Sequence, residues 1–157
     1  MNLESLYQEL ILDHYKNPLN KGLDQRADIS VHHVNPSCGD EIDLNLRAGS
    51  GRVESVTWDG VGCSISQAST SVMSDLVSGK PYSEASALID AFMEVMQSKG
   101  SLSGDEELLG DAVAFAGVSR YPARIKCALL GWMAFKDALV QLGHYQGKDD
   151  GPVKSGL

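Results

Sequence analysis

The chain has 157 residues, of which 43% are hydrophobic and 22% charged, and this suits one domain with a single buried core. Its 13 Lys and Arg against 21 Asp and Glu give a net charge of −8, which argues against binding to nucleic-acid phosphates or anionic membranes. No apolar run approaches the ~18 residues of a membrane span, and the N-terminus lacks a signal-peptide pattern, so we expect a cytoplasmic protein.

The first elements predicted along the chain are a helix and three strands. Apolar residues recur at helical spacing over residues 3–16, and Asn17-Pro18 ends that helix because proline disfavours the helical conformation of the residue before it. Strands are predicted at residues 29–34, 41–48 and 52–59. The middle strand alternates between apolar and polar residues, which indicates an antiparallel meander with one buried face.

From Ser64 onward the apolar residues recur at helical spacing, and this part of the chain is predicted to hold two helices, an acidic connection and a long final helix. One helix ends at Gly79, and Ser83 is expected to cap a second helix that ends near Gly100. Residues 101–118 are predicted to be an acidic connection with one short helical piece around Leu108. A long final helix runs from Pro122 to about Leu142 and is closed by Gly143.

The predicted elements follow the order helix, three strands, then helices, which is typical of an α+β fold. We expect a small antiparallel three-stranded sheet packed against a helical layer. We expect residues 1–145 to form one domain. Residues 146–157 have no apolar periodicity, so we expect a disordered tail.

The three cysteines, Cys38, Cys63 and Cys127, are odd in number and widely spaced, which argues against a disulfide framework. They could simply be small buried hydrophobic residues. However, Cys63 lies where the third strand passes into a helix, and a helix N-terminus stabilises a thiolate. Cys127 has Arg124 and Lys126 beside it, and positive neighbours have the same effect.

Three thiolates and one carboxylate would complete a tetrahedral zinc shell. The spacings, 25 residues from Cys38 to Cys63 and 64 from Cys63 to Cys127, match no zinc-ribbon pattern. Any metal site must therefore be assembled by the fold.

Several short motifs, in order along nearly the whole chain except the tail, share one resemblance. They are Leu6-Tyr7, Asp13-His14-Tyr15 with Asn17-Pro18, Asn35-Pro36-Ser37-Cys38-Gly39-Asp40, Gly60-Val61-Gly62-Cys63-Ser64-Ile65-Ser66 with Ala68-Ser69, and Tyr121-Pro122-Ala123-Arg124-Ile125-Lys126-Cys127-Ala128-Leu129-Leu130 with Trp132. Together they resemble the iron–sulfur cluster assembly family of the IscU and NifU N-terminal scaffolds, and most closely its zinc-dependent SufU branch.

This resemblance implies an IscU/SufU-like fold and a metal site of Cys38, Asp40, Cys63 and Cys127 that holds zinc or, alternatively, iron or a cluster. Cluster scaffolds of the IscU branch have a histidine immediately before the third cysteine, where this chain has Lys126. The segment between Cys63 and Cys127 is also longer than in those scaffolds. Both departures favour the zinc-dependent branch.

The resemblance further implies sulfur transfer as the function. The protein would accept persulfide sulfur from a SufS-type cysteine desulfurase and pass it to a downstream SufBCD-type scaffold. Cys127 would be the acceptor, with Arg124 assisting docking and supporting the thiolate. Because Cys127 lies near the start of a helix, we expect it at the rim of the site.

Two other functions remain open. The same cysteines could assemble a cluster on this protein, or they could form a structural zinc domain that regulates a partner.

Other conspicuous residues are assigned structural roles. His14 is expected to pack or to form a hydrogen bond, and His32 and His33 to point to opposite faces of a strand with at least one exposed. Trp132, Met133 and Phe135 are predicted core residues. The small hydroxyl residues of 64–74 are expected to let their helix pack closely against a neighbour.

Overall fold

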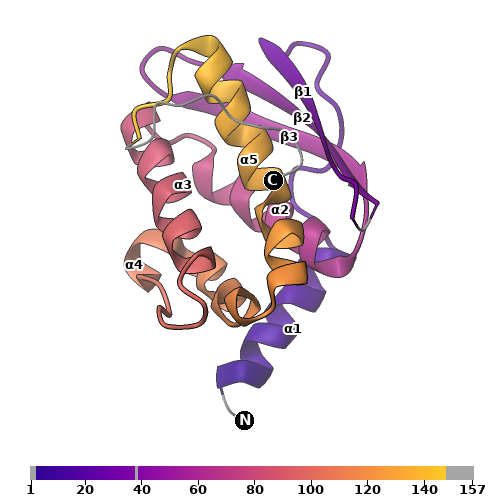
Figure 1. Cartoon of the computed structure of the whole chain (residues 1–157). Helices are drawn as coiled ribbons and strands as arrows, with labels where there is room; N and C mark the ends of the chain where they lie inside the picture. The colour runs from indigo at the N-terminus through magenta and orange to yellow at the C-terminus, as the bar shows by residue number, and fades with distance from the viewer. Residues whose placement is uncertain (1–2, 38, 148–157) are drawn as a thin grey trace.

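The computed structural model describes residues 3–37 and 39–147, so Cys38 and residues 148–157 of the predicted tail lie outside the described residues. Its elements, shown in Figure 1, are α1 (Leu3–Lys16), β1 (Ile29–Asn35), β2 (Asp40–Ala48), β3 (Val53–Val61), α2 (Ser64–Val77), α3 (Tyr82–Met96), α4 (Glu106–Leu109), the 3-10 helix η1 (Gly110–Arg120) and α5 (Pro122–Leu142). The α+β class and the helix–strands–helices order are as predicted.

The strands form one antiparallel sheet in the order β1-β2-β3. Ile42, Leu44 and Leu46 of β2 have no exposed surface, whereas Glu41 and Asp43, which precede Ile42 and Leu44, are exposed. The predicted meander with one buried face is therefore confirmed. At the end of this ladder Asn35 of β1 pairs with Asp40 of β2, which brings two buried polar residues to one corner of the sheet.

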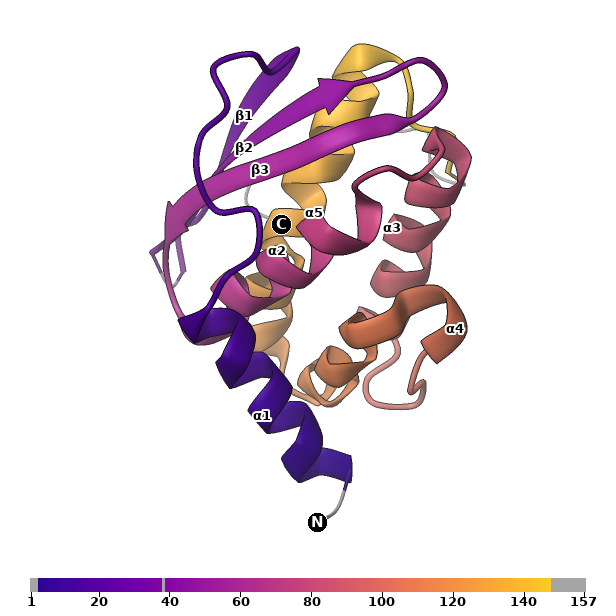
Figure 2. The same cartoon turned by 180° about the vertical axis from the view of Figure 1, so that it is seen from behind.

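Helices cover the buried face of the sheet. Figures 1 and 2 show α2 and α5 against the strands, with α3, α4 and η1 on their far side and α1 extending away from one end. Trp132, Met133 and Phe135 of α5 are buried as predicted, and the Trp132 ring stacks on Phe92 of α3 with 4.3 Å between ring centroids. Such large aromatic side chains contribute much of a core's hydrophobic stabilisation.

Small residues bring α2 and α5 close together. A Cβ at Gly131 of α5 would lie 2.2 Å from the Thr70 hydroxyl oxygen of α2, so this contact requires glycine. The Ser69 hydroxyl donates to the Ala128 carbonyl at 2.7 Å, and Trp132 Nε1 donates to Ser69 at 3.1 Å. The expected close packing of the serine-rich helix is thereby confirmed, and it places the start of α2 beside the first turns of α5.

Two predictions about local structure are wrong. Ser83 lies inside α3, which begins at Tyr82 with Pro81 at its N-cap position and without a side-chain cap. The connection at residues 101–118 contains the expected short helix, α4, but it also contains most of η1, whose Ala112, Val113 and Phe115 are buried. A 3-10 helix has three residues per turn and leaves no 3.6-residue pattern in the sequence.

Within the described residues, no helix combines the length and the apolar character needed to cross a membrane. The cytoplasmic location stays a prediction.

Candidate metal centre

Three of the four predicted ligands meet at the corner of the sheet where β2 begins. Ligand atoms of Asp40, Cys63 and Cys127 all lie within 4.8 Å of one another. Asp40 is the first residue of β2, Cys63 is the N-cap of α2, and Cys127 lies in the second turn of α5. Cys38, the fourth predicted ligand, lies outside the described residues, so its participation stays a prediction.

Asp40 connects the sheet to the start of α2. Its carboxylate is fully buried, and Oδ1 accepts a hydrogen bond from the Cys63 backbone N–H at 2.9 Å. Its other oxygen, Oδ2, accepts from the Cys63 thiol at 3.8 Å. The carboxylate therefore satisfies an otherwise unpaired donor at the helix N-terminus and also faces a sulfur.

Gly62 makes this approach sterically feasible. It has φ +156°, and a Cβ there would lie 2.3 Å from Asp40 Oδ1 and 2.8 Å from the Ser66 hydroxyl oxygen. Any side chain at residue 62 would push the carboxylate away from Cys63. The second glycine of the Gly-Val-Gly-Cys motif is thus explained sterically, because the backbone of Gly62 lies close to the Asp40 carboxylate.

Cys127 is 2% exposed, and its thiol donates to the Ala123 carbonyl at 3.8 Å. The expectation that Cys127 lies at the rim of the site is therefore wrong, and of the two described cysteines Cys63 is the more exposed. The reason is packing, because the small residues described above draw α5 onto α2 from Ala128 onward, and the continuous buried part of α5 begins at Cys127.

The donor set suits zinc. Two thiolates and a carboxylate oxygen are ligands that zinc accepts, and bonds of ~2.0 Å to oxygen and ~2.3 Å to sulfur place such atoms about 3.5 Å apart around a tetrahedral ion. The 3.8 Å between Asp40 Oδ2 and Cys63 Sγ is close to that separation. The described residues thus offer three ligands, one short of a closed shell.

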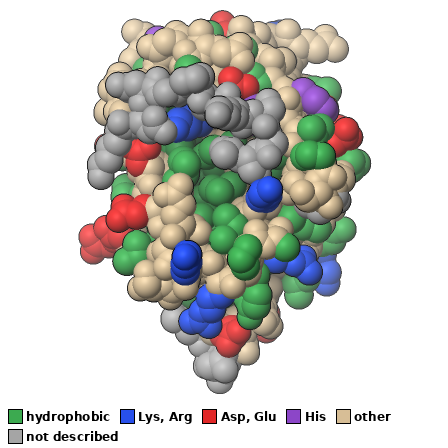
Figure 3. Space-filling model, in the orientation of Figure 1, with side chains coloured by type: hydrophobic (Ala, Val, Ile, Leu, Met, Phe, Trp, Pro, Cys, Tyr) green, Lys and Arg blue, Asp and Glu red, His purple; other side chains and the backbone are tan. Residues whose placement is uncertain are grey.

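Positive side chains lie around the start of α5. Arg124 and Lys126 are both exposed, and they precede Cys127 by three residues and by one residue in the first turns of the helix. Figure 3 shows Lys and Arg side chains on the lower half of this face, where Figure 1 places the first turns of α5. In a chain of net charge −8, these two side chains are the basic residues nearest Cys127 in the sequence.

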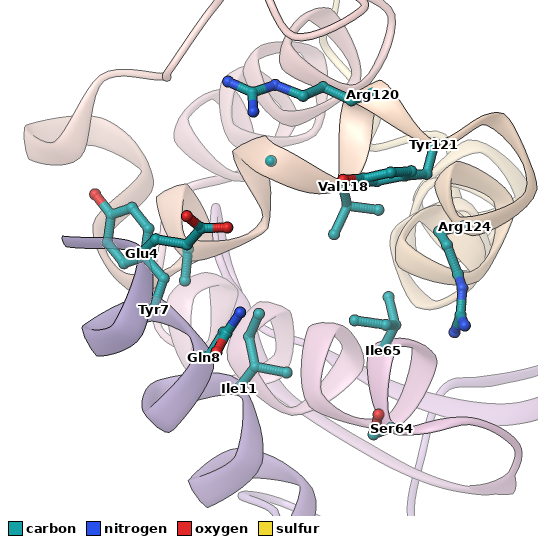
Figure 4. Close-up of a pocket in the computed structure, with 12 residues that line it drawn as sticks. Glu4, Tyr7, Gln8, Ile11, Ser64, Ile65, Val118, Arg120, Tyr121 and Arg124 are labelled. Carbon is teal, nitrogen blue, oxygen red and sulfur yellow. The ribbon is translucent and has the colours of Figure 1, made fainter. Parts of the chain in front are cut away.

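A pocket of about 510 Å³ opens next to the cluster, between α1, the start of α2, η1 and the start of α5. Ser64, which follows Cys63, and Arg124, three residues before Cys127, both line it. Figure 4 shows Arg124 on the far side of the pocket from α1, near Tyr121 and Ile65. Sequence patterns did not indicate this pocket, because its wall comes partly from η1.

The histidines lie outside the cluster. His14 Nδ1 forms a hydrogen bond with the Ser71 hydroxyl at 2.8 Å, as expected of a residue with a structural role. His32 is exposed and pairs with Asp43, whereas His33 is buried and pairs with Asp137, so the two side chains occupy opposite faces as predicted.

Residues 6–128 match the family model described as the NifU-like N-terminal domain. The chain belongs to the NifU-like N-terminal domain family. Its resemblance to this family, inferred above from the cysteine motifs, is thereby confirmed.

Two relatives of this NifU-like domain are named for different functions. The chain is 43% identical to the zinc-dependent sulfurtransferase SufU of Bacillus subtilis, over 89% of this chain and 93% of that protein. It is 39% identical to the iron–sulfur cluster assembly scaffold protein IscU of Streptococcus pyogenes, over 98% of this chain and 95% of that protein. Sequence similarity alone therefore supports both sulfur transfer and scaffolding.

Solved structures with the same fold also come from this family. The crystal structure of the SufU protein of Fervidobacterium islandicum, assigned to iron–sulfur cluster assembly by the SUF system, superposes with a TM-score of 0.73 at 33% identity. The match covers 86% of this chain and 97% of that one. An IscU/SufU-like fold, predicted from the motifs, is thus confirmed.

Proposed function

We propose that this protein is a zinc-dependent sulfur acceptor in iron–sulfur cluster assembly. It would take sulfur from the persulfide of a SufS-type cysteine desulfurase and pass it to a SufBCD-type scaffold. The observation that carries the proposal is the convergence of Asp40, Cys63 and Cys127 within 4.8 Å, in a chain 43% identical to a zinc-dependent sulfurtransferase.

The proposed metal shell is Cys38, Asp40, Cys63 and Cys127. When bound, zinc would keep the thiolates deprotonated yet unreactive until a competing ligand from the partner releases one of them. The Cys63 N–H holds the Asp40 carboxylate in place through Oδ1 and leaves Oδ2 directed at the Cys63 sulfur. Gly62 keeps the space that this arrangement needs.

Cys127 is the proposed sulfur acceptor. Its released thiolate attacks the terminal sulfur of the desulfurase persulfide, so that a new S–S bond forms on Cys127 as the old one breaks. The desulfurase cysteine leaves as a thiolate, and no external oxidant or reductant is needed. Arg124 and Lys126 support the attacking thiolate electrostatically, whereas Cys38 is followed closely by Asp40 and Glu41.

Docking of the desulfurase is proposed at the pocket beside the cluster. Arg124 lines that pocket, and two large apolar side chains near the cluster, Val61 and Tyr121, are each 62% exposed. Exposed apolar and arginine side chains of this kind are typical of contact surfaces for partner proteins. Because Cys127 is buried, a docked partner must also open the site before sulfur can be transferred.

Cluster scaffolding is the second candidate, and the 39% identity to an IscU scaffold favours it. Lys126, in place of the histidine that precedes the third cysteine in the IscU branch, argues against it. Anaerobic reconstitution with iron and sulfide separates the two candidates. A stable chromophore at one cluster per chain would support the scaffold, whereas loss of colour on desalting supports the acceptor.

Metal analysis of the purified protein, combined with thiol titration, tests the zinc proposal directly. We expect one zinc per chain and three cysteines that react with a thiol reagent only slowly until a chelator is added. Fast reaction of all three cysteines before chelation, or full zinc retention in a Cys63→Ser variant, would overturn the proposed shell. If alkylation at Cys127 leaves desulfurase stimulation unchanged, the protein is a structural zinc domain instead.

A further inference from the structure

A buried amide lies beside the cluster with an unused donor. Asn35 is 2% exposed, and its Nδ2 has no hydrogen-bond partner. Among the residues that the structure describes, four buried side-chain nitrogen or oxygen atoms lack a partner in this way, and Nδ2 of Asn35 is one of them. Leaving a buried amide N–H unpaired costs about 1–3 kcal/mol. An acceptor that arrives with the loaded site would remove this cost.

The orientation of this amide is fixed by its other end. Asn35 Oδ1 accepts a hydrogen bond from the Ser37 backbone N–H at 3.2 Å, in the turn that leads toward β2. Because the oxygen must face that N–H, the nitrogen must point elsewhere, and the usual ambiguity between amide oxygen and nitrogen does not arise.

The position of Asn35 places its side chain beside Asp40, one of the proposed ligands. Asn35 is the direct antiparallel partner of Asp40, and both side chains are buried on the inner face of the sheet. Directly opposed residues have Cβ atoms about 4.5–5.5 Å apart. Asp40 in turn lies within 4.8 Å of the sulfurs of Cys63 and Cys127.

We propose that Asn35 is a positioning residue of the metal centre, whose side-chain amide donates an N–H···S hydrogen bond to a cysteine thiolate when the centre is loaded. This inference rests on the proposed zinc centre. A thiolate is an anionic acceptor, and hydrogen bonds to metal-bound ligands orient them and tune their donor strength. The same hydrogen bond would stabilise the negative charge on the sulfur and so lower its reactivity toward electrophiles before the partner docks.

Two variants of Asn35 separate this role from a role in the turn. Asn35→Asp and Asn35→Ser each keep an oxygen that can accept the Ser37 N–H, and each lacks the amide donor. One adds a negative charge and the other does not, so an effect common to both comes from loss of the donor. Asn45→Ser is the matched control, because Asn45 is a buried asparagine of the same sheet whose Nδ2 already donates to the Asp24 carbonyl at 3.0 Å.

The experiment measures zinc affinity by competition with a chromophoric chelator, and the sulfur-to-metal charge-transfer band of the Co(II)-loaded protein. We expect both Asn35 variants to bind zinc about 10–100-fold more weakly than wild type. The charge-transfer band should move to longer wavelength, because a thiolate without its hydrogen bond is a stronger electron donor. Asn45→Ser should match wild type in both measurements.

Zinc affinity within about twofold of wild type and an unmoved band, in both Asn35 variants or in whichever folds, would overturn the role of Asn35 while leaving the zinc centre intact. Failure of the wild-type protein to bind zinc or Co(II) would overturn the centre itself, and this inference with it. The two failures are therefore distinguishable.

Discussion

Among single residues, Asp40 has two separate contacts at the proposed centre. Oδ1 accepts the Cys63 backbone N–H at 2.9 Å, and Oδ2 faces the Cys63 sulfur at 3.8 Å. One oxygen thus satisfies the start of a helix, while the other faces a sulfur of the proposed centre. Substitutions at this residue can separate the two roles.

We expect Asp40→Ala and Asp40→Asn to differ in stability but to share a functional defect. Alanine removes the acceptor for the Cys63 N–H, and loss of a hydrogen bond to a charged group costs about 1.5–3 kcal/mol, whereas asparagine keeps an acceptor there. Both variants lose the anionic ligand, so zinc held by the three thiolates alone should exchange faster and sulfur acceptance should fall. Urea unfolding, zinc content and desulfurase stimulation measure these effects. Wild-type zinc content together with wild-type stimulation in both variants would show that Asp40 is not a ligand.

Arg124 is expected to act in docking and thiolate support, and not in metal binding. Arg124→Glu should slow sulfur transfer by about tenfold or more, since reversing a charge at a contact surface mainly lowers the association rate. Zinc content should be unchanged. Arg26→Glu, with the same charge change on an exposed residue of the loop before β1, is the control. Equal slowing by both variants would indicate a net-charge effect and contradict the assignment.

Among these residues, the sequence motifs predicted which side chains come together better than they predicted how exposed each one is. The family motifs singled out Asp40, Cys63 and Cys127, and the fold brings all three together. The expected exposure of Cys127 was wrong because it was inferred from the position of one residue within one helix. Burial is decided by what packs against that helix, here the small residues of α2, and no local pattern contains that information.

At the scale of elements, the contact between α2 and α5 positions two of the candidate ligands. Cys63 caps the start of α2 and Cys127 lies in the second turn of α5. Thr70 and Gly131 touch farther along, about two turns after Cys63 and about one turn after Cys127. The separation of the two sulfurs therefore depends on how closely these helices pack.

Gly131→Ala should open this contact. The added Cβ would lie 2.2 Å from the Thr70 hydroxyl oxygen, and overpacking of this kind costs about 1–3 kcal/mol. We expect a lower urea midpoint and weaker zinc binding, because the two sulfurs are moved apart. The double variant Gly131→Ala with Thr70→Ala should recover part of both losses, since the two sites are in direct contact. Strictly additive losses in the double variant would contradict this account of the contact.

Most elements could be predicted because their residues follow the period of their structure. The alternation in β2, the pattern of α1, and Pro122 and Gly143 at the ends of α5 are local signals, and the structure has each element where they predict it. The 3-10 helix η1 could not be predicted from apolar periodicity, and with it the sequence missed the pocket that η1 lines.

For the whole molecule, the proposed zinc would connect parts of the chain that are far apart. Asp40 and Cys63 are 23 residues apart, and Cys127 follows in the last helix. A bound ion thus ties the sheet to two helices of the covering layer, and its binding free energy adds to the free energy of unfolding.

Zinc removal should therefore lower thermal stability. With free zinc a thousandfold above its Kd, the stabilisation is about 4 kcal/mol, which corresponds to about 8–16 °C in Tm for a chain of this size. Differential scanning calorimetry before and after chelation measures this shift. A Cys63→Ser variant is the control, because its Tm should respond much less to the chelator. If the Tm of the wild-type protein does not change on chelation, no bound metal ion stabilises the packing of the helices on the sheet.

Persulfide mapping can show whether sulfur from a cysteine desulfurase is accepted on Cys127, as proposed. The protein is mixed with a SufS-type desulfurase and cysteine, its persulfides are trapped with an alkylating agent, and the added sulfur is located by peptide mass spectrometry. We expect the extra sulfur on Cys127, with little on Cys38 or Cys63. Extra sulfur on Cys38 or Cys63 while Cys127 remains unmodified would contradict it.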